Sequence, residues 1–526
     1  MRIGVLDILD LPTRRMGEIP IKYCLTKQYA SVMPQAVSAW SRQLGHEVIY
    51  SAYFGVGAIT RGLPSDLDVL FVCCHSQGSP LAYATSKLFG KRGTLTVIGG
   101  PHAKAFPLDC TRYFDLVVTQ CDRQLVVDIL AGEYDRGEII ASGRMLDSLP
   151  SVQERWPEIK KSTHALGRWR MPFCTVPLLA SLGCPYTCNF CIDWDNPYRE
   201  LDHDQLVRDV DFISRELPGG YMAFHDPNFA VKFDQVMDSL EQVPAHRRPP
   251  YLMESSLSIL KGPRLQRLQD TNCIYAAPGI ESWTDYSNKS ATTGHDGEAK
   301  MLQVAEHFAT LHEYVPGLQG NLIFGLDTDQ GTDPLELTCE FMDRTPFVWP
   351  TINIPVPFGG TPLFDDMHRE RRILESMPFA FYYAPYLVIT LKNYDPVDYY
   401  EMLITMFQHC TSLRMLKMRL AATPQWQGKL THRVRTMYAR SIEKTYRNIL
   451  TQLKNDPNFY AFHTGKTTEL PEYYHREYDR MLGRMASLIP RSERTPILEQ
   501  VASDPVARSS QVELPLQRAA ASVGGE

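Results

Sequence analysis

Short apolar segments alternate with longer amphipathic ones over the first 145 residues of this 526-residue chain. Segments such as "RIGVLDIL" (2–9) and "LDVLFVCCH" (67–75) have the length and composition of buried strands. Between them, "MPQAVSAWSRQLG" (33–45) has the pattern of an amphipathic helix that ends in glycine. Strands and helices alternating at this spacing form βαβ units, which build a parallel sheet with helices on both faces. We therefore expect residues 1–145 to form an α/β domain with a doubly wound parallel sheet.

A second alternating series begins near residue 177, after an irregular stretch over 146–176 that contains three prolines. Six βα repeats over about 185 residues are typical of a partial (β/α)6 barrel related to the TIM barrel. We expect 146–176 to be a linker on the surface and 177–370 to be the barrel. The predicted barrel strands lie at 177–183, 221–225, 251–255, 273–280, 319–325 and 351–355.

The remainder of the chain changes character after the barrel. Residues 371–492 contain long amphipathic stretches rich in tyrosine, methionine and arginine, so we expect a mainly helical C-terminal region. Residues 493–526 are mostly small and polar, which predicts a disordered tail.

Composition excludes several classes of protein. The net charge is -6, and no lysine- or arginine-rich run marks the chain as a general nucleic-acid binder. No apolar run reaches the roughly 18 residues of a membrane span. The N-terminus "MRIGVLDILDLP" has the pattern of a first strand and lacks the features of a signal peptide. We therefore expect a cytoplasmic protein that binds no nucleic acid.

Three of the 12 cysteines, Cys184, Cys188 and Cys191, lie in "SLGCPYTCNFCIDW" with the spacing C-x3-C-x2-C. A structural zinc site needs four Cys or His ligands, so zinc here would require a remote fourth ligand. Three core cysteines are a second interpretation, although a Cys-Pro turn is typical of a loop. The third interpretation is a [4Fe–4S] cluster, in which three thiolates hold three irons and the fourth iron stays open.

The cysteine motif resembles that of the radical S-adenosylmethionine (SAM) superfamily, which carries this spacing in the loop after the first barrel strand. The resemblance spans about residues 177–365, and the aromatic Phe190 before the last cysteine also fits. It implies an enzyme in which Cys184, Cys188 and Cys191 hold a [4Fe–4S] cluster and the open iron chelates SAM. Reductive cleavage of SAM, with an electron from a donor such as flavodoxin or ferredoxin, would give methionine and a 5′-deoxyadenosyl radical.

Five further segments resemble later strands of the same barrel, in the correct order. They are "YMAFHDPNF" (221–229), "YLMESSLSIL" (251–260), "APGIESWTDYSNK" (277–289), "NLIFGLDTD" (321–329) and "IPVPFGGTPLFDDM" (354–367). The resemblance implies that SAM is bound by Phe190, Asp226, Glu254, Ser256, Glu281 and Pro357. Asp226 and Glu281 could instead be structural acids. Two departures from the family pattern are "GLDTD" in place of "GLPGE" and an extra glycine in "PFGGT".

The N-terminal domain resembles the cobalamin-binding domain that precedes the barrel in one class of radical SAM enzymes. The best match is "TLTVIGGPHA" (94–103), and the resemblance implies cobalamin contacts from His75, Ser76, Gly99 and Gly100. The D-x-H-x-x-G motif, whose histidine binds cobalt from below, is missing, and the nearest string is "STHALG" (162–167). Some members of this class bind cobalamin without that histidine and others have lost the cofactor, so both outcomes stay open.

The two resemblances together imply a cobalamin-dependent radical SAM C-methyltransferase that acts on a small-molecule biosynthetic intermediate. Such an enzyme would form both S-adenosylhomocysteine and 5′-deoxyadenosine from SAM. The alternative is a rearrangement, cyclisation or oxidation that yields only 5′-deoxyadenosine, with an N-terminal domain that does not use cobalamin. A scaffold protein with a redox-sensing cluster is a third possibility, against which the barrel motifs argue.

Overall fold

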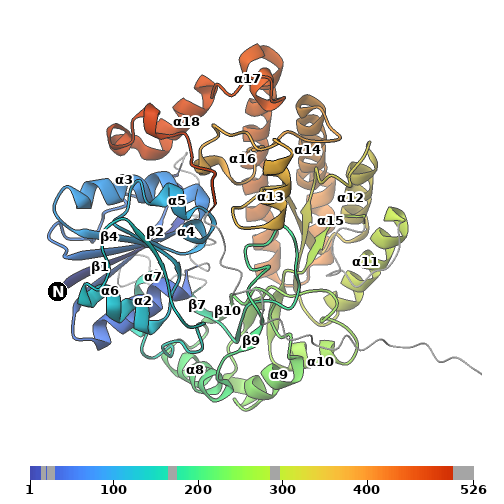
Figure 1. The fold of residues 1–526 in the computed structure, drawn as a ribbon. Coiled ribbons are helices and arrows are strands. Elements are labelled where there is room, and N and C mark those ends of the chain that lie inside the picture. Colours follow the sequence, from blue (N-terminus) through green and yellow to red (C-terminus); the bar gives the residue numbers. More distant parts are fainter. Residues whose placement is uncertain (14–18, 20–29, 164–173, 285–295, 501–526) are drawn as a thin grey trace, which may run out of the picture.

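The computed structural model describes residues 1–500 except 14–18, 20–29, 164–173 and 285–295, and two parallel sheets organise it (Figure 1). The first sheet has the strand order β2-β1-β3-β4-β5-β6, with every pair parallel. Its strands are β1 (Arg2–Asp10), β2 (Glu47–Phe54), β3 (Val69–Cys74), β4 (Leu95–Gly99), β5 (Leu116–Gln120) and β6 (Glu138–Ala141). This is the doubly wound α/β domain that the sequence predicted.

Alternation within the strands gives each face of this sheet its own core. In β1, Ile3 and Val5 point toward α2 (Val32–Gln43) and α6 (Arg123–Ala131). Leu6 and Ile8 point the other way, toward α3 (Ser79–Gly90), and share their core with α4 (Pro101–Ala105) and α5 (Pro107–Cys110). Burial on both faces explains why the strands are apolar throughout.

The second sheet is an open, parallel barrel-like sheet with the order β13-β14-β12-β11-β10-β7 and β15 paired with β14. Its strands are β7 (Thr175–Leu178), β10 (Tyr221–Phe224), β11 (Tyr251–Met253), β12 (Cys273–Ala276), β13 (Gly279–Glu281), β14 (Gly317–Ile323) and β15 (Val348–Asn353). The helices that cover its outside are α8 (His203–Glu216), α9 (Phe233–Glu241), α10 (Arg264–Asp270), α11 (Gly297–His312) and α12 (Asp333–Arg344). The predicted fold class, a doubly wound sheet followed by a partial (β/α) barrel, is confirmed.

Two predicted barrel strands differ in detail. The strand expected at 177–183 ends at Leu178, and Ser181–Leu182 (β8) instead pairs antiparallel with Arg199–Glu200 (β9). The strand expected at 273–280 is divided into β12 and β13 around Pro278, and both parts pair with β14. Proline has no N–H to donate to a sheet, which favours a break at this position.

The C-terminal region is helical, as expected, and packs against both sheets. Its helices are α13 (Pro362–Arg369), α14 (Pro396–Thr411), α15 (Leu413–Ala422), α16 (Trp426–Asn455), α17 (Pro457–His463) and α18 (Glu472–Leu482). Figure 1 shows α18 beside α3 of the first domain. Phe106 stacks on Phe379 at 3.7 Å between ring centroids, so one apolar core continues from the first domain into the C-terminal region.

The linker over 146–176 is more ordered and more buried than a surface segment. It contains α7 (Trp156–Thr163), preceded by Arg155, which is fully buried. Arg155 donates from Nη1 to Gln35 Oε1 at 2.8 Å and from Nε to the carbonyl oxygen of Pro150 at 3.0 Å. The expected surface position is therefore wrong for the described part of the linker, because a buried guanidinium ties it to α2.

The first residues of the predicted disordered tail, 493–500, pack on the first domain in the described structure. Residues 493–500 are described, and Leu498 is buried in the core shared with the first domain. Arg112 donates to the carbonyl oxygens of Glu493 and Thr495 at 2.8 Å each, and the N–H of Ile497 donates to Asp109 Oδ1 at 2.9 Å. Residues 501–526, the rest of the predicted tail, lie outside the described residues.

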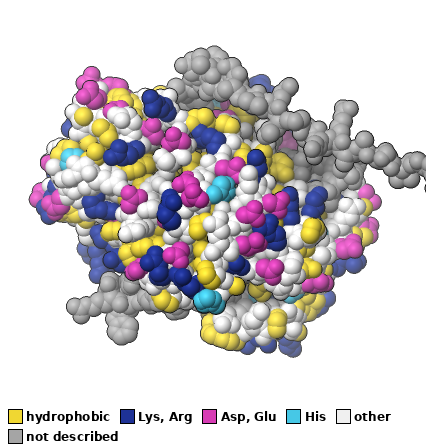
Figure 2. All heavy atoms as spheres, turned by 90° about the horizontal axis from the view of Figure 1, so that it is seen from below, with side chains coloured by type: hydrophobic (Ala, Val, Ile, Leu, Met, Phe, Trp, Pro, Cys, Tyr) yellow, Lys and Arg dark blue, Asp and Glu magenta, His cyan; other side chains and the backbone are white. Residues whose placement is uncertain are grey.

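The described surface has mixed charge and no membrane-spanning helix. Seen from below, acidic and basic side chains are interspersed over the face in Figure 2. Among the described residues, no helix combines the length and the apolar character that crossing a bilayer requires.

Candidate active site

The three predicted cluster ligands lie in one closed loop, residues 183–197, at the carboxyl end of the barrel strands. The two ends of the loop are joined by a hydrogen bond from the N–H of Cys184 to the carbonyl oxygen of Asn196 at 3.1 Å. Gly183 has φ of +67°, and a Cβ at this position would overlap the carbonyl oxygen of Pro197. Only glycine satisfies both constraints, so Gly183 allows the loop to close.

The loop places three thiols on a compact backbone. The N–H of Cys191 donates to the carbonyl oxygen of Cys188, and that of Trp194 to the carbonyl oxygen of Cys191, both at 3.1 Å. Cys184 is buried, and the other two cysteines are half-buried. In the described part of the chain, no three His, Cys, Asp or Glu side chains are grouped to hold a single metal ion. A [4Fe–4S] cluster bonds its thiolates to separate irons, so this donor set on a fixed loop fits a cluster.

Loops that follow two other barrel strands anchor the cysteine loop. Trp194 Nε1 donates to the carbonyl oxygen of Gly360 at 2.7 Å, and the N–H of Leu363 donates to the carbonyl oxygen of Asn189 at 3.0 Å. Tyr186, between the first two cysteines, forms a 2.7 Å hydrogen bond with Ser258. Because these contacts join residues far apart in the chain, 166 positions for Trp194 and Gly360, the loop is fixed by the tertiary structure.

The first domain also contacts this loop, through α4. Lys104 Nζ donates to the carbonyl oxygen of Ile192 at 2.6 Å and pairs with Asp195 at 3.2 Å. In the same place, a Cβ on Gly359 would overlap the carbonyl oxygen of Ala105. The extra glycine noted in the sequence therefore permits close backbone contact between the barrel and the first domain.

Replacing Lys104 by methionine is expected to lower product formation about ten- to a hundredfold, the usual effect of losing a residue that orients metal ligands. Methionine keeps the length of the side chain but removes the hydrogen bond to Ile192 and the charge opposite Asp195. Iron content and product yield after reconstitution measure the effect. Lys104→Arg should retain activity, and Lys91→Met, at the exposed lysine that follows α3, is the matched control. Full activity of Lys104→Met would contradict a positioning role.

Asp226 lies beneath the start of the cysteine loop. Its buried carboxylate accepts hydrogen bonds from the N–H groups of Ala180 and Ser181 and from the Ser181 hydroxyl, at 2.5 to 3.1 Å. Burial raises the pKa of this carboxyl to about 6, although the hydrogen bonds that it accepts act to lower the pKa. These bonds explain why β7 ends early, and they give Asp226 a structural role. Its contact with SAM stays a prediction.

Stability is expected to depend on the charge of Asp226. Its pKa of about 6 in the folded chain exceeds the ordinary 3.8, so the folded chain binds this proton more tightly than the unfolded chain. The stabilising contribution of the protonated carboxyl is therefore full below about pH 4 and falls by about 3 kcal/mol as the pH rises through about 6. Calorimetric melting of the wild type and Asp226→Asn at about pH 5 and 7 should show the wild type losing stability relative to the variant. A constant difference would contradict the shift.

The other predicted SAM residues gather around β11 and β13. Ser256 pairs with Gly279 as an isolated parallel bridge, and the N–H of Ser256 donates to Asn228 Oδ1 at 2.9 Å. Glu254 is exposed. Glu281 is buried with φ of +66°, a strained conformation for a residue with a side chain, and its carboxylate folds back over Gly279. Residues 285–289 of the segment that contains Glu281 lie outside the described residues.

Asn228 is a candidate that the sequence interpretation missed. Its side chain is buried, and its Nδ2 has no hydrogen-bond partner among the described residues. A buried amide donor without a partner is costly and is expected to meet an acceptor on a ligand. Its position two residues after Asp226, in "HDPNF", was the available signal.

The altered turn after the fifth barrel strand uses its acids locally. Asp329 Oδ2 accepts the N–H groups of Gly325 and Leu326 at 2.9 and 3.1 Å. Asp327 forms a bidentate pair with Arg372 at 2.6 and 2.7 Å. In the next loop Pro357 is buried, and Phe190 of the cysteine loop packs against the core shared with the first domain.

The four residues predicted to contact cobalamin lie at the carboxyl ends of neighbouring strands, β3 and β4. The His75 side chain is exposed, yet desolvation by the surrounding protein lowers its pKa. Gly99 ends β4, and Gly100 has φ of +88°, with the position of a Cβ 2.5 Å from Cys73 Sγ. Ser76 is buried and lies 3.2 Å from His102 Nδ1. Carboxyl ends of parallel strands are the usual ligand-binding edge of such sheets.

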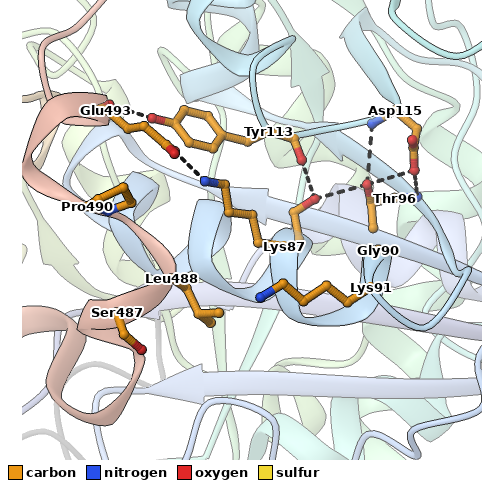
Figure 3. Close-up of a pocket in the computed structure, with 11 residues that line it drawn as sticks. Lys87, Gly90, Lys91, Thr96, Tyr113, Asp115, Ser487, Leu488, Pro490 and Glu493 are labelled. Atoms are coloured by element: carbon orange, nitrogen blue, oxygen red, sulfur yellow. Dashed lines mark hydrogen bonds and ion pairs between the residues drawn. The ribbon is translucent and has the colours of Figure 1, made fainter.

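A separate hollow of about 480 Å³ lies between α3 and the segment around Pro490 (Figure 3). Lys87 pairs there with Glu493, whose carbonyl oxygen accepts from Tyr113 at 2.6 Å. These polar groups join the C-terminal segment to the first domain. None of the predicted site residues lines this hollow, so we do not place the chemistry there.

No protein-family model matches the chain, but curated proteins are similar to it in sequence. Bacteriochlorophyllide d C-8(2)-methyltransferase of Chlorobaculum tepidum is 22% identical over 353 residues, which cover 63% of this chain and 75% of that protein. Bacteriochlorophyllide d C-12(1)-methyltransferase of the same organism is 24% identical, covering 58% of this chain and 66% of that protein. Hopanoid C-2 methylase of Rhodopseudomonas palustris is 27% identical over a region that covers 39% of this chain and 40% of that protein.

Solved structures also show similarity at low sequence identity. TsrM from Kitasatospora setae, a radical SAM methyltransferase with cobalamin and a [4Fe-4S] cluster bound, is 12% identical with a TM-score of 0.49 and covers 70% of this chain and 78% of that chain. Methylornithine synthase has a TM-score of 0.28 at 12% identity and covers 47% of this chain and 69% of that chain. The fold assignment therefore rests on the two sheets described above.

Proposed function

We propose that this chain is a radical SAM enzyme that transfers a methyl group to a carbon atom of a small molecule, with cobalamin as the methyl carrier. The predicted enzyme class is confirmed by three relatives, each named for methylation at a numbered position. The predicted cofactors are a [4Fe–4S] cluster, SAM and cobalamin. The observation that carries the proposal is the contact between the cysteine loop and the ligand-binding edge of the first sheet.

That contact is made by α4, which follows the glycine turn after β4. Gly99 and Gly100 end the strand at the predicted cobalamin edge, and Lys104 and Ala105 then touch the barrel loops. The barrel loops concerned are the cysteine loop and the loop after the sixth barrel strand. The glycine turn of the first sheet and the two barrel loops all follow the carboxyl ends of parallel strands, where α/β folds bind ligands. One short helix therefore joins the two predicted cofactor sites, as transfer between cofactors would require.

The residues around the cysteine loop have distinct roles in this proposal. Cys184, Cys188 and Cys191 hold the cluster, and Gly183 and Asp226 fix the loop that carries them. Asn228 offers a buried donor to SAM, beside the SAM contacts predicted from Ser256 and Glu281. When bound, the cluster and SAM supply a 5′-deoxyadenosyl radical for hydrogen abstraction, and cobalamin supplies the methyl group.

The remaining parts of the chain follow from the same proposal. Residues 1–145 form the cobalamin-type domain, 177–370 the radical SAM barrel and 371–492 the helical region that joins them. The enzyme acts in the cytoplasm, where flavodoxin or ferredoxin delivers electrons to the cluster. The aromatic core that the first domain shares with the helical region packs the two parts of the chain against each other.

The test is an anaerobic product count. Iron and sulfide are reconstituted, hydroxocobalamin, SAM and a strong reductant are added, and unbound corrin is removed before turnover with candidate substrates. Retained corrin with both S-adenosylhomocysteine and 5′-deoxyadenosine is the expected result. No retained corrin, with 5′-deoxyadenosine alone in the presence of a converted substrate, would replace methyl transfer by a non-methylating radical reaction.

A further inference from the structure

Exposed apolar side chains concentrate on α15 and the first half of α16. Of eight large hydrophobic side chains exposed among the described residues, five lie between residues 413 and 438. They are Leu413, Trp426, Leu430, Met437 and Tyr438, with exposures of 68, 67, 42, 65 and 41%. Trp426, Leu430 and Met437 follow a helical spacing of four and seven residues, so they share one face of α16. We call these five residues and the charged residues beside them the α15–α16 face.

This face is also strongly basic within an acidic protein. Residues 411–442 contain seven lysines and arginines and no aspartate or glutamate, whereas the whole chain has a net charge of -6. Arg433 lies between Leu430 and Met437 on the same side of α16, and it is exposed, as are Lys417 and Arg440. Arg414 is exposed too but pairs with Asp343 at 3.1 Å. A helix that combines an exposed apolar stripe with lysine and arginine is typical of a membrane-surface element.

The opposite side of α16 packs against the rest of the protein, so the exposure belongs to one side of a docked helix. Thr436, Ala439 and Tyr446 are buried on the inner side of the helix. Arg435 lies 5.7 Å and Arg419 4.8 Å from the ring centroid of Trp349. These inward arginines stack on the barrel, whereas Arg433 is exposed, and Arg440, also exposed, donates to the carbonyl oxygen of Thr411 at 2.8 Å.

The position of Trp349 shows which end of the barrel carries the α15–α16 face. Trp349 is the second residue of β15, near the amino end of that strand. The cysteine loop contacts Gly360, beyond the carboxyl end of the same strand. The face is therefore remote from the predicted cluster. A protein that donates electrons must approach the cluster closely, which disfavours this face as its docking site.

We propose that the α15–α16 face docks the protein onto the surface of a negatively charged lipid bilayer. Trp426 and Tyr438 are residues that favour the membrane–water interface, and Leu413, Leu430 and Met437 supply apolar area that can enter it. The lysines and arginines around them are attracted to anionic headgroups. Docking of this kind uses the surface of a helix and needs no membrane span.

The test is binding of the reconstituted holoprotein to vesicles. Phosphatidylcholine vesicles with phosphatidylglycerol should bind the protein, vesicles of phosphatidylcholine alone should bind it at least tenfold more weakly, and salt should reduce binding. Arg433→Glu and Trp426→Ser should each weaken binding about tenfold or more. Leu302→Ser, an exposed apolar position on α11, is the matched control and should bind as the wild type does.

A second measurement reports which residue enters the lipid. Brominated lipid should quench part of the tryptophan fluorescence of the wild type. Trp426→Phe should still bind the vesicles but lose that quenching. Equal binding to neutral and anionic vesicles, or unchanged binding of Arg433→Glu and Trp426→Ser, would overturn the proposal. Variants that bind vesicles normally but lose binding to reduced flavodoxin or ferredoxin would overturn it in favour of a protein partner.

Discussion

Replacing Cys188 by serine is expected to abolish formation of both SAM-derived products. A hydroxyl is a poor ligand for the irons of a [4Fe–4S] cluster, which select thiolate. Cys188 is half-buried, and the hydrogen bonds that shape its loop join backbone groups, from Cys184 to Asn196 and from Cys191 to Cys188, so serine at 188 leaves them in place. Iron content, the visible absorbance of the reconstituted protein and the yield of 5′-deoxyadenosine measure the effect, and all three should fall to background.

The control for this change is another half-buried cysteine. Cys339 lies on α12, outside the cysteine loop, and Cys339→Ser should retain iron and activity. Normal iron content and normal 5′-deoxyadenosine in Cys188→Ser would exclude it as a ligand and restore the zinc or core interpretations. Loss of iron in both variants would point to general instability, which melting curves of the two proteins would reveal.

The fold was predictable because its signals are local. Apolar runs and amphipathic helices repeat in the order that parallel α/β sheets require, and the C-x3-C-x2-C spacing is contained in eight residues. The break in the strand at Pro278 and the early end of β7 at Leu178 were not predicted. The second depends on a carboxylate, Asp226, that lies 46 residues away from Ala180, and no periodicity records such a contact.

The cysteine ligands of the site could be predicted from the sequence, but the roles of its acidic residues could not. Asp226, Asp327 and Asp329 all lie at carboxyl ends of barrel strands, yet each is engaged by donors of the chain itself. The sequence shows where an acidic residue stands but not which donors of the folded chain will hydrogen-bond to its carboxylate. Asn228 was missed for the related reason that an unsatisfied buried donor can be recognised only once its neighbours are in place. Lys104 was missed because its contact joins two domains.

Replacing Gly359 by alanine is expected to uncouple SAM cleavage from methylation. The added methyl group would overlap the backbone oxygen of Ala105, which cannot swing aside as the end of a side chain does. Helix α4 must then move away from the barrel, which also strains the hydrogen bond from Lys104 to the cysteine loop. Misplacement of reacting groups by about 1 Å costs about a hundredfold in rate. We expect methylated product to fall by about this factor, whereas 5′-deoxyadenosine still forms.

The neighbouring residue provides a matched control that separates steric from backbone effects. Gly360 has φ of +76°, and a Cβ there would meet nothing within 4 Å. Gly360→Ala should therefore cost about 1 kcal/mol of stability from its backbone conformation and keep methylation coupled to cleavage. The ratio of methylated product to 5′-deoxyadenosine in the two variants distinguishes the steric effect from the backbone effect. An unchanged ratio in Gly359→Ala would show that the contact with Ala105 does not set the distance between the cofactor sites, and an equal loss in both variants would assign the effect to the loop itself.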